Sequence, residues 1–230
     1  MNIAQMCAAS RRAFPKRKAI AYRDVSLTFE QLDDLSTRCA GALSALGASK
    51  GAKVALLLEK TPELVIAFVA CAKLGAMVVP LNYQLRPSTI ARMVVETGGD
   101  VIIAASKYVP LLSEVPKEHK VLRKIVKCGE TKGNEGLVWA RLLDEAPDDF
   151  EPVETDDDTP FYLNFTSGST GEPKAAVTTH GNLFWNTISS VETLGLRHND
   201  VHLCMFPAYL HPARDILQGC LSRRDLGFGE

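Results

Sequence analysis

The strongest constraint on the fold is the regular alternation of strand and helix patterns over the first 130 residues. Short runs rich in apolar residues predict strands at 53–58, 76–81, 101–104 and 121–126. Stretches with apolar residues at helical spacing lie before the first strand, at 32–46, and between later ones, at 61–72 and 88–97. Strands that alternate with helices of this length predict βαβ units on mainly parallel sheets, an α/β fold. Helices then cover both faces of the sheet, which explains why the strands are apolar on both sides.

Local chemistry predicts where these helices begin and end. Thr28 and Gln31 have the spacing of a capping box, so a helix is expected to start there. Gly47 is its expected C-terminal cap, because glycine adopts the left-handed conformation at little cost. Thr61 followed by Pro62 predicts a second helix start, with an N-cap and a proline in the first turn.

The composition excludes several classes of function. The formal net charge is −1, with 26 Lys and Arg against 27 Asp and Glu. This balance gives no basic excess that would indicate a nucleic-acid partner. We interpret the basic cluster at 11–18 as the end of a helix and a solvated turn. The longest apolar run, Leu64 to Ala72, has nine residues, far fewer than the roughly 20 that a transmembrane helix needs.

The cysteines indicate a reducing compartment. Their spacing contains no CxxC-type metal or redox motif; the six are Cys7, Cys39, Cys71, Cys128, Cys204 and Cys220. The amino terminus does not resemble a secretory signal, because apolar residues precede the arginines instead of following them. We therefore predict free, mostly buried thiols and a cytoplasmic location.

An acidic stretch stands before the segment that carries the chemistry. Residues 144–158 contain nine acidic side chains and no basic one. A cluster of carboxylates can bind a hard cation, but this spacing fits no calcium loop and Pro147 and Pro152 interrupt it. A solvated connector is the favoured interpretation.

A glycine- and hydroxyl-rich loop follows the apolar strand predicted at Phe161–Phe165. Its two glycines allow close backbone approach and positive φ, so that N–H groups can point at oxyanions. The hydroxyl groups add donors, and Lys174, next to Pro173, adds a positive charge suited to phosphate. The pattern predicts a phosphate-binding loop made of Thr166, Ser167, Gly168, Ser169, Thr170, Gly171 and Lys174.

Two common nucleotide motifs do not fit this loop. A Walker A loop requires lysine directly after a glycine five positions beyond the first, but Pro173 stands five positions after Gly168. The GxGxxG fingerprint of dinucleotide-binding folds is also absent. A Gly/Ser-rich surface turn is the remaining alternative, and the tetrapeptide at 168–171 alone would favour it.

The longer string resembles the signature of the AMP-forming adenylating superfamily, which includes acyl-CoA synthetases, luciferases and peptide-synthetase adenylation domains. The match comprises Thr166–Lys174 and the later Thr179-His180-Gly181-Asn182. Residues 27–32 are similar to the family's early helix-start motif, and residues 73–82 to its second core motif. The resemblance spans residues 3–206, in the expected order.

The resemblance implies a two-step reaction and the site residues for it. A carboxylate attacks the α-phosphate of ATP, and a thiol, usually that of coenzyme A, then takes the acyl group. The seven loop residues given above would contact the phosphates, with Thr166 also near Mg²⁺. Lys174 would stabilise charge as pyrophosphate leaves. His180 is interpreted as the start of a helix and not as an acid or base.

The carboxyl end departs from the family pattern. Ala175 stands where the family usually has glycine, and the family's later motifs are absent, so we expect the chain alone to be inactive. The alternative is a non-catalytic nucleotide- or partner-binding remnant, or half of a site that another chain completes. An unfinished sheet edge predicts self-association. The chain is predicted to have four parts. They are an α/β block at 1–143, the acidic connector at 144–159, a strand–phosphate-loop–helix segment at 160–207 and an off-pattern tail at 208–230.

Overall fold

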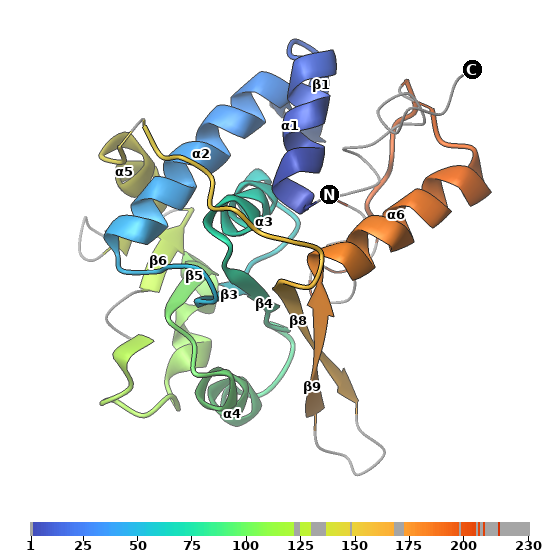
Figure 1. Cartoon of the computed structure of the whole chain (residues 1–230). Helices are drawn as coiled ribbons and strands as arrows, with labels where there is room; N and C mark the ends of the chain where they lie inside the picture. The colour runs from blue at the N-terminus through green and yellow to red at the C-terminus, as the bar shows by residue number, and fades with distance from the viewer. Residues whose placement is uncertain are drawn as a thin grey trace.

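The structure is a computed structural model that describes residues 2–121, 125–129, 137–147, 149–167, 173–197, 199–205, 207, 209 and 216. Seven of the described strands form one sheet in the order β7-β6-β5-β3-β4-β8-β9 (Figure 1). Their bounds are β3 Lys53–Leu57, β4 Met77–Pro80, β5 Val101–Ala105, β6 Ile125–Cys128, β7 Leu137–Val138, β8 Pro160–Ser167 and β9 Pro173–Thr179. The helices are α1 Ile3–Ala13, α2 Phe29–Ala45, α3 Pro62–Leu74, α4 Pro87–Thr97, η1 Ser106–Leu112, α5 Trp139–Asp144 and α6 His180–Leu194.

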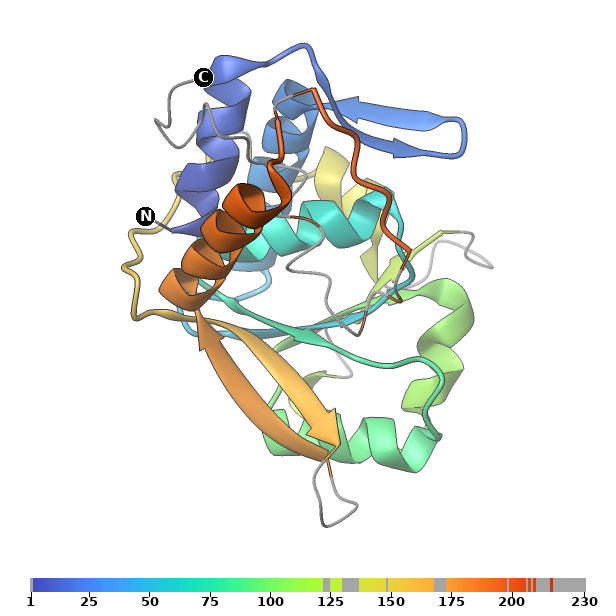
Figure 2. The ribbon, with the colours of Figure 1, turned by 90° about the vertical axis from the view of Figure 1, so that its right-hand side faces the viewer.

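The sheet is mainly parallel, as the sequence predicts. Strands β3 to β7 pair in parallel, and β8 joins β4 in parallel at Val78↔Tyr162. Only β9 runs antiparallel, against β8. A separate antiparallel ribbon, β1 Lys18–Tyr22 and β2 Val25–Thr28, extends from the body and has no counterpart in the predicted elements (Figure 2). The predicted α/β class is confirmed.

Both faces of the sheet are covered, which produces three layers. Helices α1, α2, α3 and α5 contribute to the core on one face, and α4 and η1 to the core on the other (Figures 1 and 2). Successive residues of a strand point to opposite faces. In β3, Val54 and Leu56 accordingly join the first core, while Ala55 and Leu57 join the second. Burial on both faces is why period-two alternation is missing from the sequence.

The helix boundaries follow the predicted capping residues. The Thr28 side chain accepts the Gln31 N–H at 3.2 Å, and the Gln31 side chain accepts the Thr28 N–H at 2.9 Å. This reciprocal pair is the predicted capping box, and it begins α2. Thr61 is the N-cap of α3, and Gly75 ends that helix with a φ of 70°. A side chain would be strained at that φ, so glycine is the expected residue there.

One predicted strand lies in a different place. The sequence predicts a strand at 121–126, whereas β6 is Ile125–Cys128 and begins its pairing with β5 at Ile102↔Ile125. Val121 is buried in the core on the α4 side, but its N–H donates to His119 Nδ1 at 3.3 Å. An apolar residue in a buried turn looks the same in the sequence as a strand residue, so the predicted start at residue 121 was wrong. Residues 122–124 of the predicted strand lie outside the described residues, and 125–126 belong to β6.

The acidic stretch after α5 crosses the outer side of α2 and α3 (Figure 1). Its backbone is anchored: the Val153 N–H donates to the Lys73 carbonyl at 2.7 Å, and the Thr155 carbonyl accepts from Asn2 Nδ2 at 3.1 Å. Glu151 and most of the later carboxylates stay exposed. The domain boundaries drawn at this stretch stay a prediction.

The described cysteines are all free, as predicted. Cys7, Cys39, Cys71 and Cys128 are buried, and Cys204 is exposed. Burial raises the pKa of the Cys39 and Cys71 thiols well above their usual value, so these thiols stay protonated. Within the described part of the chain, no helix combines the length and apolar character needed to cross a membrane.

Candidate functional site

The candidate site is at the turn of the β8–β9 hairpin. The antiparallel register continues to the last pair, Ser167↔Pro173, so residues 168–172 connect the two strands. The preceding pair is Thr166↔Lys174. The hairpin thus brings the first hydroxyl residue of the signature opposite its lysine, eight positions later in the chain.

The predicted phosphate contacts are described to different extents. The sequence predicts Thr166 and Ser167 in a loop, whereas their backbone forms the last two residues of β8. Lys174 is the second residue of β9, and its side chain is exposed. Four of the predicted contacts lie outside the described residues: Gly168, Ser169, Thr170 and Gly171. The role of all seven residues in phosphate binding stays a prediction.

Side-chain packing holds the hairpin on the sheet. Backbone pairing between β8 and β4 is short, with Val78↔Tyr162 as its register pair. The Phe161 ring lies edge-on to Phe68 of α3, with centroids 4.9 Å apart, and Tyr162 lies 6.5 Å from the same ring. Leu163 joins the core on the opposite face, with α4. Burial on both faces therefore fixes the strand that leads into the site.

His180 begins α6 and has a structural environment. Thr179 is the N-cap and accepts the Asn182 N–H at 3.2 Å. The His180 side chain is buried; its Nδ1 accepts the Ile3 N–H at 3.3 Å, and its ring stacks on Phe161 at 4.6 Å. The prediction that His180 marks a helix start is confirmed. Because Nδ1 accepts a hydrogen bond, the neutral ring carries its proton on Nε2.

The burial of His180 should make the protein less stable in acid. Burial lowers the pKa of His180 from 6.5 to about 4, while Asp156 and Asp157 oppose this shift. The unfolded chain therefore takes up this proton near pH 6.5 and the folded chain only near pH 4. We expect the free energy of unfolding to be unaffected by this group well above pH 6.5 and to fall by about 3 kcal/mol between pH 6.5 and 4.

Urea denaturation across that pH range checks this expectation. His180→Asn retains an acceptor for Ile3 and should lose the His180 part of the pH slope. His202→Asn changes an exposed histidine and should keep the slope. Equal slopes in wild type and His180→Asn would contradict the assignment.

A polar cluster at the same edge of the sheet was not predicted. Because β8 is parallel to β4, the site lies at the edge where the carboxyl ends of β3, β4 and β5 also lie. Glu59 follows β3, Tyr83 follows β4, and Lys107 and Tyr108 follow β5. Glu59 Oε2 accepts from Lys107 Nζ and Glu59 Oε1 from the Tyr108 hydroxyl, both at 2.7 Å. The Tyr83 and Tyr108 rings stack at 4.6 Å and 5°.

This cluster occupies the position where open α/β sheets bind ligands. The chain leaves β3 towards β4 on one side and leaves β5 towards β6 on the other, so the strand order reverses between β3 and β5. Ligands bind in the crevice at such a switch point. The sequence signal was available, because a polar residue follows each of these apolar strands directly or within three positions.

Electrostatics keep the cluster in a single protonation state near neutral pH. The hydrogen bonds from Lys107 and then Tyr108 lower the pKa of Glu59. Burial first, and then the hydrogen bond to Glu59, raise the pKa of Tyr108. The hydrogen bond to Glu59 raises the pKa of Lys107. Glu59 is therefore an ionised acceptor that holds a protonated lysine and a protonated phenol.

The described residues contain no cluster of metal-binding side chains. Across the described ranges, no three His, Cys, Asp or Glu residues lie close enough together to hold one. Mg²⁺ needs several oxygen ligands in near-octahedral geometry. Thr166 is the predicted metal contact, and only its backbone is described.

Comparison with known proteins gives consistent matches over most of the chain. A sequence model of the family described as AMP-binding enzyme matches residues 7–221. The long-chain-fatty-acid–CoA ligase FadD13 of Mycobacterium tuberculosis is 31% identical over 186 residues, covering 81% of this chain and 36% of that protein. The feruloyl-CoA synthase of an Amycolatopsis species is 31% identical over 198 residues, covering 86% of this chain and 37% of that protein.

A solved structure matches the fold. The inhibitor-bound N-terminal domain of FACL13 from Mycobacterium tuberculosis superposes with a TM-score of 0.83 at 28% identity, covering 95% of this chain and 55% of that chain. The chain spans about a third of the length of the curated relatives it matches, 36% of the ligase and 37% of the synthase.

Proposed function

The chain belongs to the AMP-binding enzyme family, and on that premise we propose that it forms the phosphate-binding part of an acyl-CoA synthetase. In the proposed reaction a carboxylate attacks the α-phosphate of ATP, which gives an acyl-adenylate and pyrophosphate. The thiol of coenzyme A then displaces AMP to give the thioester. The observation that carries the proposal is the β8–β9 hairpin, which pairs Lys174 with Thr166 around residues 168–172.

The proposed contribution of this chain is electrostatic. Negative charge builds up on the bridging and terminal oxygens as pyrophosphate leaves. Lys174 would place an exposed ammonium group beside those oxygens. The amides of 168–171 and the hydroxyls of Thr166, Ser167, Ser169 and Thr170 would donate hydrogen bonds to them. Mg²⁺ would neutralise part of the phosphate charge, with Thr166 as its nearby protein group.

Carboxylate-dependent ATP–pyrophosphate exchange, together with pyrophosphate titration calorimetry, tests the proposal on the purified chain. Acids from acetate to palmitate are compared after circular dichroism has established that the chain is folded. We expect the chain to bind pyrophosphate without catalysing exchange, because exchange needs substrate positioning together with charge stabilisation. Exchange would identify an active enzyme, and the acid that supports the fastest exchange would identify its substrate class. A folded chain that neither binds nor exchanges would contradict the proposed function.

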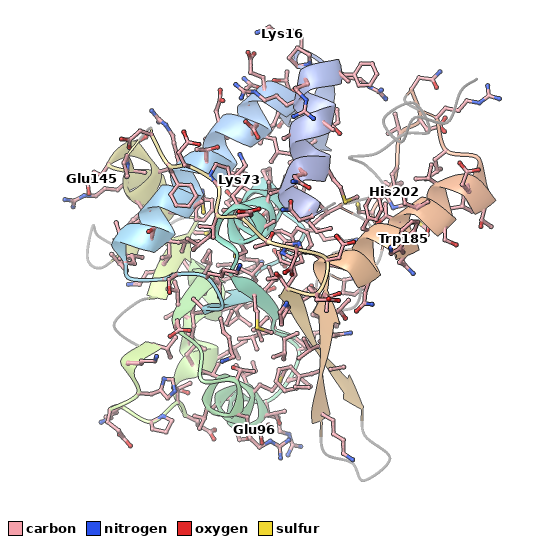
Figure 3. All side chains as sticks on the ribbon, viewed as in Figure 1. Lys16, Lys73, Glu96, Glu145, Trp185 and His202 are labelled. Carbon is pink, nitrogen blue, oxygen red and sulfur yellow. The ribbon has the colours of Figure 1, made fainter. Side chains whose placement is uncertain are left out.

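Lys174→Ala should weaken pyrophosphate affinity by roughly 1.5–3 kcal/mol, because it removes a charge-assisted contact. That loss is about a 10- to 150-fold rise in the dissociation constant. Lys16→Ala is the matched control, since Lys16 lies at the opposite end of the molecule from the hairpin (Figure 3). An equal effect of the two substitutions, or none from Lys174→Ala, would remove the phosphate role of Lys174.

A second candidate is a binding function completed by another copy or another chain. Within the described part of the sheet, β9 is the last strand, and Val177 on it is 55% exposed. The run Ala175–Thr179 contains no charge and no proline, the usual protections of an edge. We infer self-association through this edge. Sedimentation velocity should show a species larger than the monomer that grows with concentration, and a monomer throughout would exclude it.

A further inference from the structure

Four side chains form a continuous column at the carboxyl edge of the sheet. The Lys107 ammonium lies 5.0 Å from the Tyr108 ring centroid, and Tyr108 stacks on Tyr83. On Tyr83 the ring of Tyr209 makes an edge-on contact, with centroids 5.3 Å apart and planes at 81°. The first three members come from strand ends on the switch point, while Tyr209 comes from far along the chain, beyond α6.

The platform beneath Tyr209 is fixed before anything binds to it. Tyr108 cannot turn freely, because its hydroxyl donates to Glu59 at 2.7 Å and its ring stacks on Tyr83 within 5° of parallel. Glu59 is itself held by Lys107 at 2.7 Å. The face of Tyr83 is therefore presented in one orientation. A surface that is already ordered binds a ring without a large loss of conformational freedom.

The described contacts of Tyr209 are with Tyr83 and Gln84. Its hydroxyl donates to Gln84 Oε1 at 2.7 Å, and its ring touches Tyr83. In the chain leading to it, the Cys204 carbonyl accepts a hydrogen bond from Lys60 Nζ, just after β3. Val201, near the start of that segment, is 94% exposed.

We propose that Tyr83 and Gln84 form a binding position for a planar aromatic ring that carries an N–H or O–H donor at its rim, and that Tyr209 fills this position in the free chain. Tyr209 itself shows the chemistry that the position accepts: an aromatic ring in edge-on contact with Tyr83 and a donor aimed at the side-chain oxygen Oε1 of Gln84. The position adjoins the switch point between β3 and β5 through the stack of Tyr83 on Tyr108, and such folds bind ligands at a switch point. It is separate from the phosphate role proposed for Lys174.

Two sources could supply such a ring: a phenol, as in an aromatic acid, or an aminopurine base. Saturation-transfer NMR on the full chain distinguishes them, with p-cresol and adenosine as separate probes and toluene as the ring that lacks a donor. Tyr209→Ala removes the internal competitor. For one of the two donor-bearing probes we expect a dissociation constant at least fivefold lower in this variant than in wild type. The dissociation constant of toluene should not fall in this way.

Second-site variants locate the binding. In the Tyr209→Ala background, Tyr83→Leu should abolish the gain in affinity. Gln84→Ala should reduce the affinity for the donor-bearing probe to the affinity for toluene. Lys174→Ala should leave binding unchanged, so a failure here is distinct from a failure of the phosphate role. A gain in affinity for p-cresol alone assigns the ring to a phenol. A gain for adenosine alone assigns it to a nucleobase. Equal binding to wild type and Tyr209→Ala, or toluene binding as well as both donors, would overturn the proposal.

Discussion

Asp33→Ala is expected to lower the free energy of unfolding by about 3 kcal/mol, because it removes the carboxylate that neutralises a buried lysine. Lys73 has a side chain that is only 4% exposed, and its Nζ donates to Asp33 Oδ1 at 2.8 Å. It also donates to the Asp33 carbonyl at 2.8 Å and to Thr37 Oγ1 at 2.6 Å. Figure 3 shows Lys73 inside the molecule, where α3 meets α2.

The size of the loss follows from what remains after the substitution. The carbonyl of residue 33 and Thr37 still accept from Lys73, so the loss is at the low end of the 3–5 kcal/mol typical of broken buried pairs. Arg11, which bonds the other carboxylate oxygen of Asp33 at 2.9 Å, loses that contact as well and keeps the one to Asp34. Urea denaturation monitored by circular dichroism measures the change, with an unchanged dependence on urea concentration expected.

Asp34→Ala is the matched control for this prediction. Asp34 is the next residue on α2 and contacts Arg11 at 3.2 Å, but its side chain is 59% exposed. An exposed pair of this kind contributes about 0–1 kcal/mol. The double change Asp33→Asn with Lys73→Met should cost less than the sum of the single changes, since it leaves no buried charge. Equal losses from Asp33→Ala and Asp34→Ala would contradict the buried pair.

Lys73 also shows what a linear pattern cannot contain. In the sequence it ends an apolar run and resembles a solvated helix terminus. Its burial depends on Asp33 and Thr37, forty and thirty-six positions earlier on a different helix. Helix boundaries were predictable because their chemistry is local, as the reciprocal bonds of Thr28 and Gln31 show. A pair formed between helices has no such local signal.

The two antiparallel hairpins were missed for different reasons. In the β1–β2 ribbon the turn contains Arg23 with a φ of 51°. The usual signal for such a turn is a glycine or asparagine, and it is missing there. Strand β9 reads Pro-Lys-Ala-Ala-Val-Thr-Thr, which is only weakly apolar, and it forms because β8 pairs with it from Pro160 to Ser167.

The candidate site was predictable in part for the same physical reason. The phosphate loop is a contiguous string, so glycine, hydroxyl and lysine chemistry could be recognised together. The cluster of Glu59, Tyr83, Lys107 and Tyr108 is assembled from three strand ends. Each residue is ordinary in its own segment, and only the order β5-β3-β4 brings them together. Sequence reasoning lacks that order, although polar residues after apolar strands indicate the edge.

Phe68→Ala is expected to destabilise the protein by about 3–5 kcal/mol, because a fully buried aromatic ring leaves a cavity that the surroundings fill only in part. Phe68 has no exposed surface and contacts Phe161 edge-on at 4.9 Å. Phe161 in turn stacks on His180, the first residue of α6. A cavity here therefore removes support from both ends of the segment that contains the phosphate loop.

The loss of stability from Phe68→Ala should be larger around the hairpin than in the rest of the sheet. Backbone pairing of β8 with β4 is short, so packing on Phe68 holds much of the hairpin in place. Native-state hydrogen exchange should accelerate at the amides of β8 and α6 more than at those of β3 and β5, which pair along their whole length. Phe68→Leu, which keeps most of the volume, should cost less than about 1.5 kcal/mol. Uniform acceleration across all strands, or equal losses from the two substitutions, would show that Phe68 does not anchor the hairpin.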